Sequence, residues 1–416
     1  MRIRLESRTA KLFAVAVTAL LLGPYCSLAG IRYLAARAAQ KDDRVSLERA
    51  VSLVPHNAEF RERLARRLLF SEQDAQGALR NFTIAATLNP YSATSWLGVA
   101  QSQLILGNES ASLDAVQHAI QVDPTTPSVA WESATLLVAS GQTEPALREI
   151  RFVLANDPAL LLQGLQLVRR LEPSAARAAQ VAIPPDPAIH FSYINLLVRS
   201  GEMGQAKKAW PVVIGLHKPF DPKLSFFFLN ALVQSREAQA AVQYWNELGK
   251  SLPAVARLNQ PGNLVHNAGF EFDILNGGFD WLYAPSGEVN LQAETSDFHE
   301  GRRSLLVTFL GQRTTDIGMH QYVLLEPNTR YRFRGFMKSD LQTANGLQFM
   351  LVDLANNNHL FETADSVDDR HWKEFSAEFT TARNTGLCIL LMGRTSRSLI
   401  RGNILVDDIR LEKAAQ

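Results

Sequence analysis

The sequence predicts a multidomain α and β protein: an N-terminal transmembrane helix, a helical repeat array and a C-terminal all-β sandwich. Three observations support this prediction. An uncharged apolar run lies near the N-terminus, prolines recur at a nearly constant spacing after it, and short runs of alternating apolar residues fill the C-terminal part.

The composition is that of a folded protein with little net charge. Hydrophobic residues make up 46% of the 416 residues and charged residues 20%, which excludes a largely disordered chain. The 42 Lys and Arg residues nearly balance the 41 Asp and Glu residues, and the net charge of +1 argues against a nucleic-acid partner. Only two cysteines occur, Cys26 and Cys388, which excludes a disulfide scaffold and a cysteine-based zinc site.

Residues 12–31 form the apolar run, and a helix of that length crosses about 30 Å of hydrocarbon. Basic residues precede it at Arg2, Arg4, Arg8 and Lys11, which favours a cytoplasmic tail over residues 1–11. We therefore expect a single-pass signal anchor in a bacterial inner membrane, with the bulk of the chain periplasmic or extracytoplasmic. Cleavage at Ser27-Leu28-Ala29, as in a secretory signal, is the alternative.

Residues 45–255 contain the predicted helical repeats. Pro55, Pro90, Pro124 and Pro158 are spaced by 35, 34 and 34 residues. This spacing resembles the tetratricopeptide repeat (TPR) family, whose 34-residue unit is a helix–turn–helix with a proline near its end. The resemblance implies a TPR-type α-solenoid with units near 59–92, 93–126, 127–160, 187–220 and 222–255, and an irregular helical pair over 161–186.

In that family the first helices of successive units line a concave face that binds a protein partner. The positions that the resemblance places on this face are Arg63, Arg67, Gln101, Trp131 and Thr135. We expect a protein partner there, although solvated or core roles for these side chains are the simpler alternative.

Alternation of apolar residues begins after Pro261-Gly262 and continues to residue 413. In Thr329–Lys338, for example, Tyr331, Phe333 and Met337 share one face of a predicted strand. Further runs with this character are 303–310, 346–353, 372–380, 386–393 and 402–411. The pattern predicts an all-β jelly-roll sandwich over 262–413. Because a short polar stretch precedes it, we expect this segment to fold by itself.

The same segment resembles the carbohydrate-binding-module-like members of the galactose-binding superfamily. The resemblance lies in Asn263–Glu271, Trp281, His299–Leu305, Pro327–Tyr331, Trp372 and Val406–Ile409. It implies that the sandwich binds a glycan, because aromatic side chains can stack on the apolar face of a sugar. The candidates for such contacts are Tyr283, Tyr322 and Trp281, with Phe298 and Trp372 as further aromatics. A core role is the alternative for both tryptophans.

Glu271 and Asp407 are two further candidates. Strand alternation places Asp407 on the same face as Leu405, Ile409 and Leu411, and therefore in an apolar interior. A buried carboxylate needs compensation. The family resemblance implies a structural calcium ion, with Glu271 and Asp407 as its ligands. The alternative is that backbone N–H groups satisfy Asp407 without a metal.

Motifs for nucleophilic, metal-dependent or nucleotide-dependent catalysis are absent from the sequence. We therefore expect a non-enzymatic, membrane-anchored adaptor of the bacterial cell envelope that has a role in surface polysaccharide assembly or export. Its repeats would bind a protein partner and its sandwich a glycan or another protein. Two alternatives are a structural assembly scaffold without glycan binding and an accessory module of a carbohydrate-active enzyme.

Overall fold

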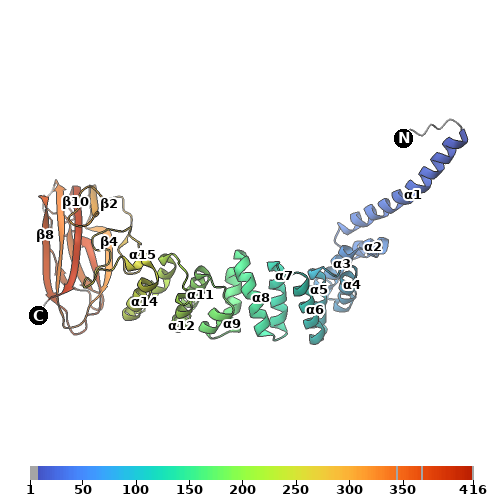
Figure 1. Ribbon diagram of the computed structural model, residues 1–416, viewed down its shortest axis with the longest axis horizontal. Helices are drawn as coiled ribbons and strands as arrows, with labels where there is room; N and C mark the ends of the chain where they lie inside the picture. Colours follow the sequence, from blue (N-terminus) through green and yellow to red (C-terminus); the bar gives the residue numbers. More distant parts are fainter. Residues whose placement is uncertain (1–7, 343–344, 367–368, 415–416) are drawn as a thin grey trace. The chain divides into compact units, whose positions relative to one another are not determined.

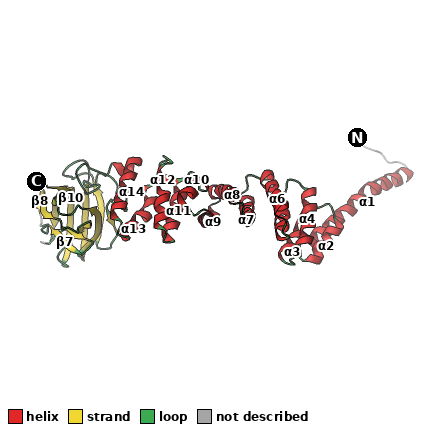
Figure 2. Cartoon of the chain, turned by 90° about the horizontal axis from the view of Figure 1, so that it is seen from below, coloured by secondary structure: helices red, strands yellow, loops and turns green. Residues whose placement is uncertain are grey.

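The computed structural model describes residues 8–342, 345–366 and 369–414 (Figure 1). It divides into two compact units, Met1–Pro184 and Pro185–Gln416. Arg2 and Arg4, on which the predicted membrane orientation partly depends, lie outside the described residues. Figure 2 distinguishes the helical segments from the strands.

The described part of the first unit is helical. Its α-helices are α1 (Arg8–Ala39), α2 (Arg44–Leu53), α3 (Ala58–Phe70), α4 (Ala75–Leu88), α5 (Ala93–Ile105), α6 (Glu109–Val122), α7 (Pro127–Ala139), α8 (Thr143–Asn156), α9 (Leu161–Leu171) and α10 (Ala175–Val181). A short 3-10 helix, η1 (Pro158–Leu160), precedes α9.

Helix α1 is long and apolar enough to cross a membrane. The most apolar 18-residue stretch of its segment Lys11–Ala39 has a mean hydropathy of 2.0. No part of that stretch is buried inside the structure. The helix ends at Ala39, where Arg63 of α3 donates to the Ala39 carbonyl oxygen over 2.7 Å and to Asp42 over 2.9 Å. Asp43 then caps α2 by accepting from the N–H of Ser46. Length and composition thus make α1 a candidate membrane span.

Successive helix pairs of the first unit repeat at a constant interval. The second helices α4, α6 and α8 begin at residues 75, 109 and 143, which are 34 residues apart each time. These second helices bury small and large apolar residues: Ala78, Phe82, Ala85, Val116, Ala119, Ala146, Ile150 and Val153. Helices α4 and α5 approach so closely that a Cβ on Gly98 would overlap the ring of Phe82. The prediction of a helical N-terminal part is confirmed.

The second unit begins with helices of the same kind. They are α11 (Pro187–Arg199), α12 (Met203–Ile214), α13 (Phe226–Gln234), α14 (Ala238–Ser251) and α15 (Pro253–Ala256), with the 3-10 helix η2 (Pro222–Ser225) before α13. Trp210 of α12 and Trp245 of α14 are fully buried and fill the space between neighbouring helices.

The rest of the second unit is an all-β sandwich, as predicted. Its strands are β1 (Leu282–Tyr283), β2 (Val289–Glu294), β3 (Ser304–Arg313), β4 (Asp316–Leu324), β5 (Arg330–Leu341), β6 (Gln348–Asp353), β7 (Asn358–Glu362), β8 (Asp369–Thr380), β9 (Leu387–Gly393) and β10 (Leu399–Lys413). They form two antiparallel sheets with the orders β1-β4-β9-β6-β7 and β2-β3-β10-β5-β8. We call them the β4 sheet and the β10 sheet.

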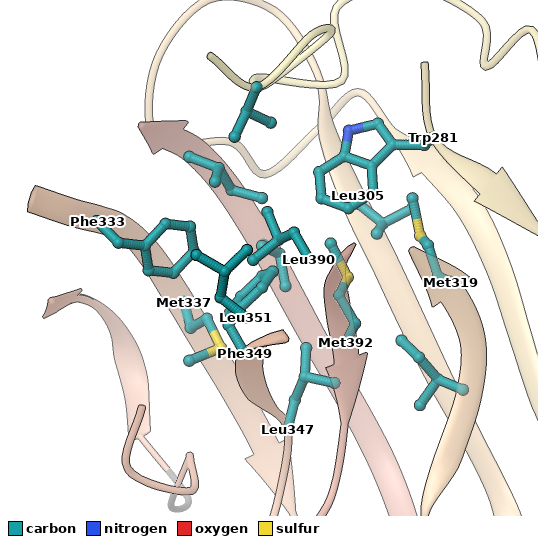
Figure 3. Packing of buried hydrophobic residues seen from close by; sticks show 14 of the residues in the cluster. Trp281, Leu305, Met319, Phe333, Met337, Leu347, Phe349, Leu351, Leu390 and Met392 are labelled. Atoms are coloured by element: carbon teal, nitrogen blue, oxygen red, sulfur yellow. The ribbon is translucent and has the colours of Figure 1, made fainter. Parts of the chain in front are cut away.

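Apolar side chains from both sheets form one core between them. Figure 3 shows Phe333 of the β10 sheet near Leu351 and Leu390 of the β4 sheet, while Trp281 covers one end. The polar Gln321 occupies one inward position of β4, between the apolar Met319 and Val323. The Gln321 amide is nevertheless satisfied: it accepts from the N–H of His266 and donates to the His266 carbonyl oxygen over 2.8 and 2.9 Å.

Helices and sandwich pack tightly within the second unit. A Cβ on Gly277 would overlap the ring of Phe226, and one on Gly278 would overlap the ring of Trp245. The backbone φ of Gly278 is +64°, which also favours glycine there. Trp245 also contacts His266, and burial lowers the pKa of His266 to about 4. The compact unit that contains the sandwich therefore begins at Pro185 and includes the helices α11–α15.

Candidate functional site

The outer face of the β4 sheet is largely apolar. Strand register aligns His320 with Leu391 and Met350 in one row, and Tyr322 with Ile389 and Val352 in the next. A third row contains Leu324, Leu387 and Leu354. These side chains point away from the core because the alternate residues Met319 and Val323 belong to it. The strands β4, β9 and β6 thus present aliphatic and aromatic side chains on the outer face of this sheet.

Tyr322 and His320 provide the aromatic rings of this face. Their ring centroids lie 5.7 Å apart at an interplanar angle of 79°. Burial lowers the pKa of His320, so its imidazole is neutral at pH 7. Half-buried rings above an aliphatic floor suit the apolar face of a sugar ring.

A cleft of about 620 Å³ adjoins the third row of this face. Leu324, Leu354 and Leu387 line it from the sheet, together with Asn384 from the loop before β9. Its other side is formed by the turn between α13 and α14, including Arg236, and by the first residues of α14, including Gln239. Helices of the second unit thereby border the outer face of the β4 sheet.

The three aromatic residues predicted as candidates for sugar contacts, Trp281, Tyr283 and Tyr322, have different surroundings in the structure. Trp281 is fully buried, and its indole N–H donates to the Asn267 carbonyl oxygen over 3.3 Å. It is therefore a core residue and offers no face to a ligand. Tyr283 pairs with Met319, so its side chain lies on the inner side of the β4 sheet at the sheet edge. Tyr283 lines a separate cavity of about 260 Å³ that also contains Phe272 and Arg303. Only Tyr322 lies on the outer face.

The outer face of the β10 sheet contains the other aromatic candidates. Trp372 is half-buried and donates from Nε1 to Asp297 over 3.3 Å, while Phe298 is exposed. His299 stacks on Phe336 with ring centroids 3.6 Å apart. On the strand of Phe336, Arg330 pairs with Glu378 and Arg332 with Glu374 over 2.6 and 3.4 Å, so both guanidinium groups have carboxylate partners.

Asp407 lies on the opposite side of the β10 sheet from the predicted one. The pairing of β10 with β5 shifts between Asp407 and Arg410, and Asp408 has a φ of +46°. This β-bulge reverses the alternation, so Val406 and Ile409 enter the core while Asp407 faces outward. The loop that contains His299 covers Asp407 and leaves it without exposed surface. The predicted face was wrong because alternation assumes an unbroken register.

Backbone N–H groups surround both predicted metal ligands. Asp407 Oδ2 accepts from the N–H groups of His299 and Glu300 over 2.8 and 3.0 Å, and Oδ1 accepts from that of Asp408 over 2.7 Å. Burial raises the pKa of Asp407, and these hydrogen bonds oppose that shift. Glu271 Oε1 accepts from the backbone N–H groups of Arg302 and Arg303 over 2.9 and 3.3 Å. The two carboxylates therefore clamp the 299–303 turn.

The groups that surround Glu271 and Asp407 show how well the two carboxylates suit calcium. Calcium takes about six to eight oxygen ligands, whereas N–H groups face these carboxylates. Among the described residues no group of three or more His, Cys, Asp or Glu side chains is placed to hold a metal ion. The two carboxylates are thus better suited to holding the backbone N–H groups of the 299–303 turn than to binding calcium.

The helical candidates Arg63, Arg67, Gln101 and Trp131 have different surroundings. Arg63 closes the C-terminus of α1, as described above, and Arg67 lies 3.7 Å from Glu72. Gln101 of α5 and Trp131 of α7 are half-buried. The last two retain surface that a partner could contact, whereas Arg63 already has structural partners.

Sequence reasoning missed His320, the aliphatic rows and the α13–α14 turn. A period-two pattern in Ile317, Met319 and Val323 could have revealed β4 and hence the outward position of His320. No sequence signal pointed to Arg236, because its place beside the sheet depends on tertiary packing.

Comparison with known proteins addresses the sandwich directly. Residues 262–390 match the family described as a carbohydrate binding domain. No curated protein matches the chain.

Among solved structures, the CBM22-1 xylan-binding domain of Paenibacillus barcinonensis Xyn10C is 19% identical, covers 36% of this chain and 94% of its own, and has a TM-score of 0.27. A CBM4 structure is 14% identical with coverages of 36% and 99% and a TM-score of 0.29. MamA protein is 14% identical with coverages of 46% and 91% and a TM-score of 0.28. The family match and the two antiparallel sheets together identify the C-terminal part as a carbohydrate-binding-module-like β-sandwich.

Proposed function

We propose that this protein is a non-enzymatic, membrane-anchored adaptor of the bacterial cell envelope whose sandwich binds polysaccharide on the outer face of the β4 sheet. The match of residues 262–390 to a carbohydrate binding domain carries the glycan-binding part. The outward rings of Tyr322 and His320 above an aliphatic floor support the choice of face.

Replacement of Tyr322 by alanine tests the choice of face. The full chain in detergent is expected to bind one or more members of a glycan array, and Tyr322→Ala should weaken that binding about 10-fold or more. This estimate corresponds to the loss of about 1.5 kcal/mol of apolar burial.

Two matched controls accompany this experiment. Tyr91→Ala changes an 83% exposed tyrosine of the first unit and should not alter binding. Tyr283→Ala should also have no effect, because Tyr283 lines a separate cavity. Unchanged binding by Tyr322→Ala together with a loss in Tyr283→Ala would move the site to that cavity. Binding to no glycan would overturn the proposed function.

The adaptor role rests on the helical part. Helix α1 would be the membrane anchor, and the 34-residue repeat of helix pairs supports a TPR-type array that binds a protein partner. In this proposal Gln101 and Trp131 contribute to the partner-binding face, and a role in polysaccharide assembly or export follows from combining the two binding parts.

Membrane fractionation with co-purification tests the adaptor role. The chain should stay in the membrane fraction after an alkaline wash, and a reporter fused after Gln416 should be active only outside the cytoplasm. A partner that co-purifies from these membranes should be lost when Trp131 is replaced by alanine. Release by the wash or a cytoplasmic reporter would overturn the anchor. Partner retention by Trp131→Ala would overturn the assigned face.

A further inference from the structure

The cleft beside the α13–α14 turn continues the proposed glycan-binding face. Leu324 follows Tyr322 by two residues on β4, and Leu387 precedes Ile389 by two on β9, so the cleft floor and the face lie on the same side of one sheet. Two residues of a strand span about 7 Å. A glycan on the Tyr322 row would therefore place its next sugar residue in the cleft.

The lining of this cleft has one uncompensated charge. Arg236 and Glu237 are its only ionisable residues, and Glu237 forms an ion pair with Lys207 of α12. The guanidinium of Arg236 makes no hydrogen bond or ion pair with any residue that the structure describes. The side-chain amides of Gln239 and Asn384 are likewise unpaired within the described residues. An apolar floor with a few convergent polar groups is typical of small-ligand sites.

Arg236 occupies a turn position where the related helix pairs have glycine. Gly107, Gly141 and Gly201 lie two residues after the ends of α5, α7 and α11, with φ values of 80°, 70° and 77°. Arg236 is the equivalent residue after α13 and has a φ of 60°. A long side chain in this conformation is strained relative to glycine. The turn that borders the cleft thus contains an arginine at a position where the backbone conformation favours glycine.

We propose that this cleft is a subsite for a carboxylated sugar residue, such as a uronic acid, of the glycan bound on the Tyr322 face. The inference rests on the proposed glycan-binding function. A guanidinium recognises a carboxylate through two parallel N–H···O bonds. Glu237, the one carboxylate among the described residues that line this cleft, is paired with Lys207. Gln239 and Asn384 can donate to or accept from the neighbouring hydroxyl groups.

The test compares pairs of oligosaccharides of the same linkage that differ only at C6, which is the carbon of a hydroxymethyl group in one member and of a carboxylate in the other. The full chain in detergent is titrated with hexasaccharide pairs of β-1,4-linked glucose and galactose and of α-1,4-linked galactose. We expect about 10- to 100-fold tighter binding of the carboxylated member of the bound pair, as for a charge-assisted contact.

Arg236→Gly should remove this preference and leave binding of the neutral member unchanged. Because three equivalent turns contain glycine, the variant should fold with an unchanged or higher thermal midpoint. Gln73→Gly is the matched control: Gln73 has a φ of 57° in the turn before α4, and its replacement makes the same backbone change away from the cleft. This control should keep the full preference.

The outcomes separate this inference from the function on which it rests. Equal binding of both members by the unchanged chain, or a preference that survives in Arg236→Gly, would overturn the carboxylate subsite alone. Loss of binding to both members in Tyr322→Ala supports the face itself. Binding to glycans of the array but to neither member of any pair would overturn the carboxylate subsite alone, whereas binding to no glycan of the array would overturn the glycan-binding function and the subsite together.

Discussion

Replacing Trp245 with alanine is expected to lower the free energy of unfolding of the second unit by about 3–5 kcal/mol. Trp245 is fully buried and contacts His266, Phe279 and the backbone of Gly278, so the change would leave a large cavity where α14 meets the sandwich. Urea unfolding of the fragment 185–416, followed by circular dichroism, measures the effect.

Two variants control for the chemical change itself. Trp372→Ala removes a half-buried tryptophan from the outer face of the β10 sheet and should cost less than half as much. Trp245→Phe should also cost less than Trp245→Ala, because it retains a ring and removes an indole N–H that has no acceptor among the described residues.

The same contacts predict that the sandwich alone is unstable. A fragment of residues 262–416 lacks Phe226 and Trp245, and it would expose Phe279, which is buried in the longer fragment. This expectation replaces the sequence-based one that the sandwich folds by itself. Equal stability of the fragments 262–416 and 185–416 would show that the helices contribute little.

Replacing Asp407 with alanine is expected to cost about 3 kcal/mol, with or without calcium. Three backbone N–H groups would lose their acceptor, and each such loss costs about 1–3 kcal/mol when the group stays buried. Thermal unfolding of the fragment 185–416 with a chelator and with added calcium measures both quantities.

Glu294→Ala is the matched control for Asp407→Ala. Glu294 also accepts N–H groups of its own turn, those of Thr295 and Ser296, but it is exposed to solvent. Its loss should cost less than about 1 kcal/mol, because water can replace the acceptor.

A calcium response would change the assignment of the two carboxylates. If chelation lowers the thermal midpoint of the unchanged fragment, and Asp407→Ala no longer responds, Glu271 and Asp407 bind the ion that the family resemblance implies. At a free calcium concentration about a hundredfold above Kd, binding to the folded state would contribute about 2.7 kcal/mol.

Local patterns determined the elements of this protein. The uncharged run at 12–31 predicts the long helix α1, since length and hydropathy are properties of a contiguous segment. The recurring prolines predict helix pairs, because each stops a helix at the same point of a 34-residue unit. Alternation predicts most strands of the sandwich, including β3, β5 and β9, because the strand period of two is visible wherever one face is apolar.

Tertiary structure decided where the functional side chains lie. The β-bulge at Asp408 puts Asp407 on the opposite face of its sheet from the one that an unbroken alternation predicts. Tyr283 and Tyr322 both lie on strands of the β4 sheet, but their strand pairings put them on opposite sides of it. Arg236 lies beside the outer face of the β4 sheet only because α13 and α14 pack beside a sheet formed by residues 282–393. Register and packing of this kind depend on contacts between distant segments, so the sequence determined the elements and the fold alone determined the site.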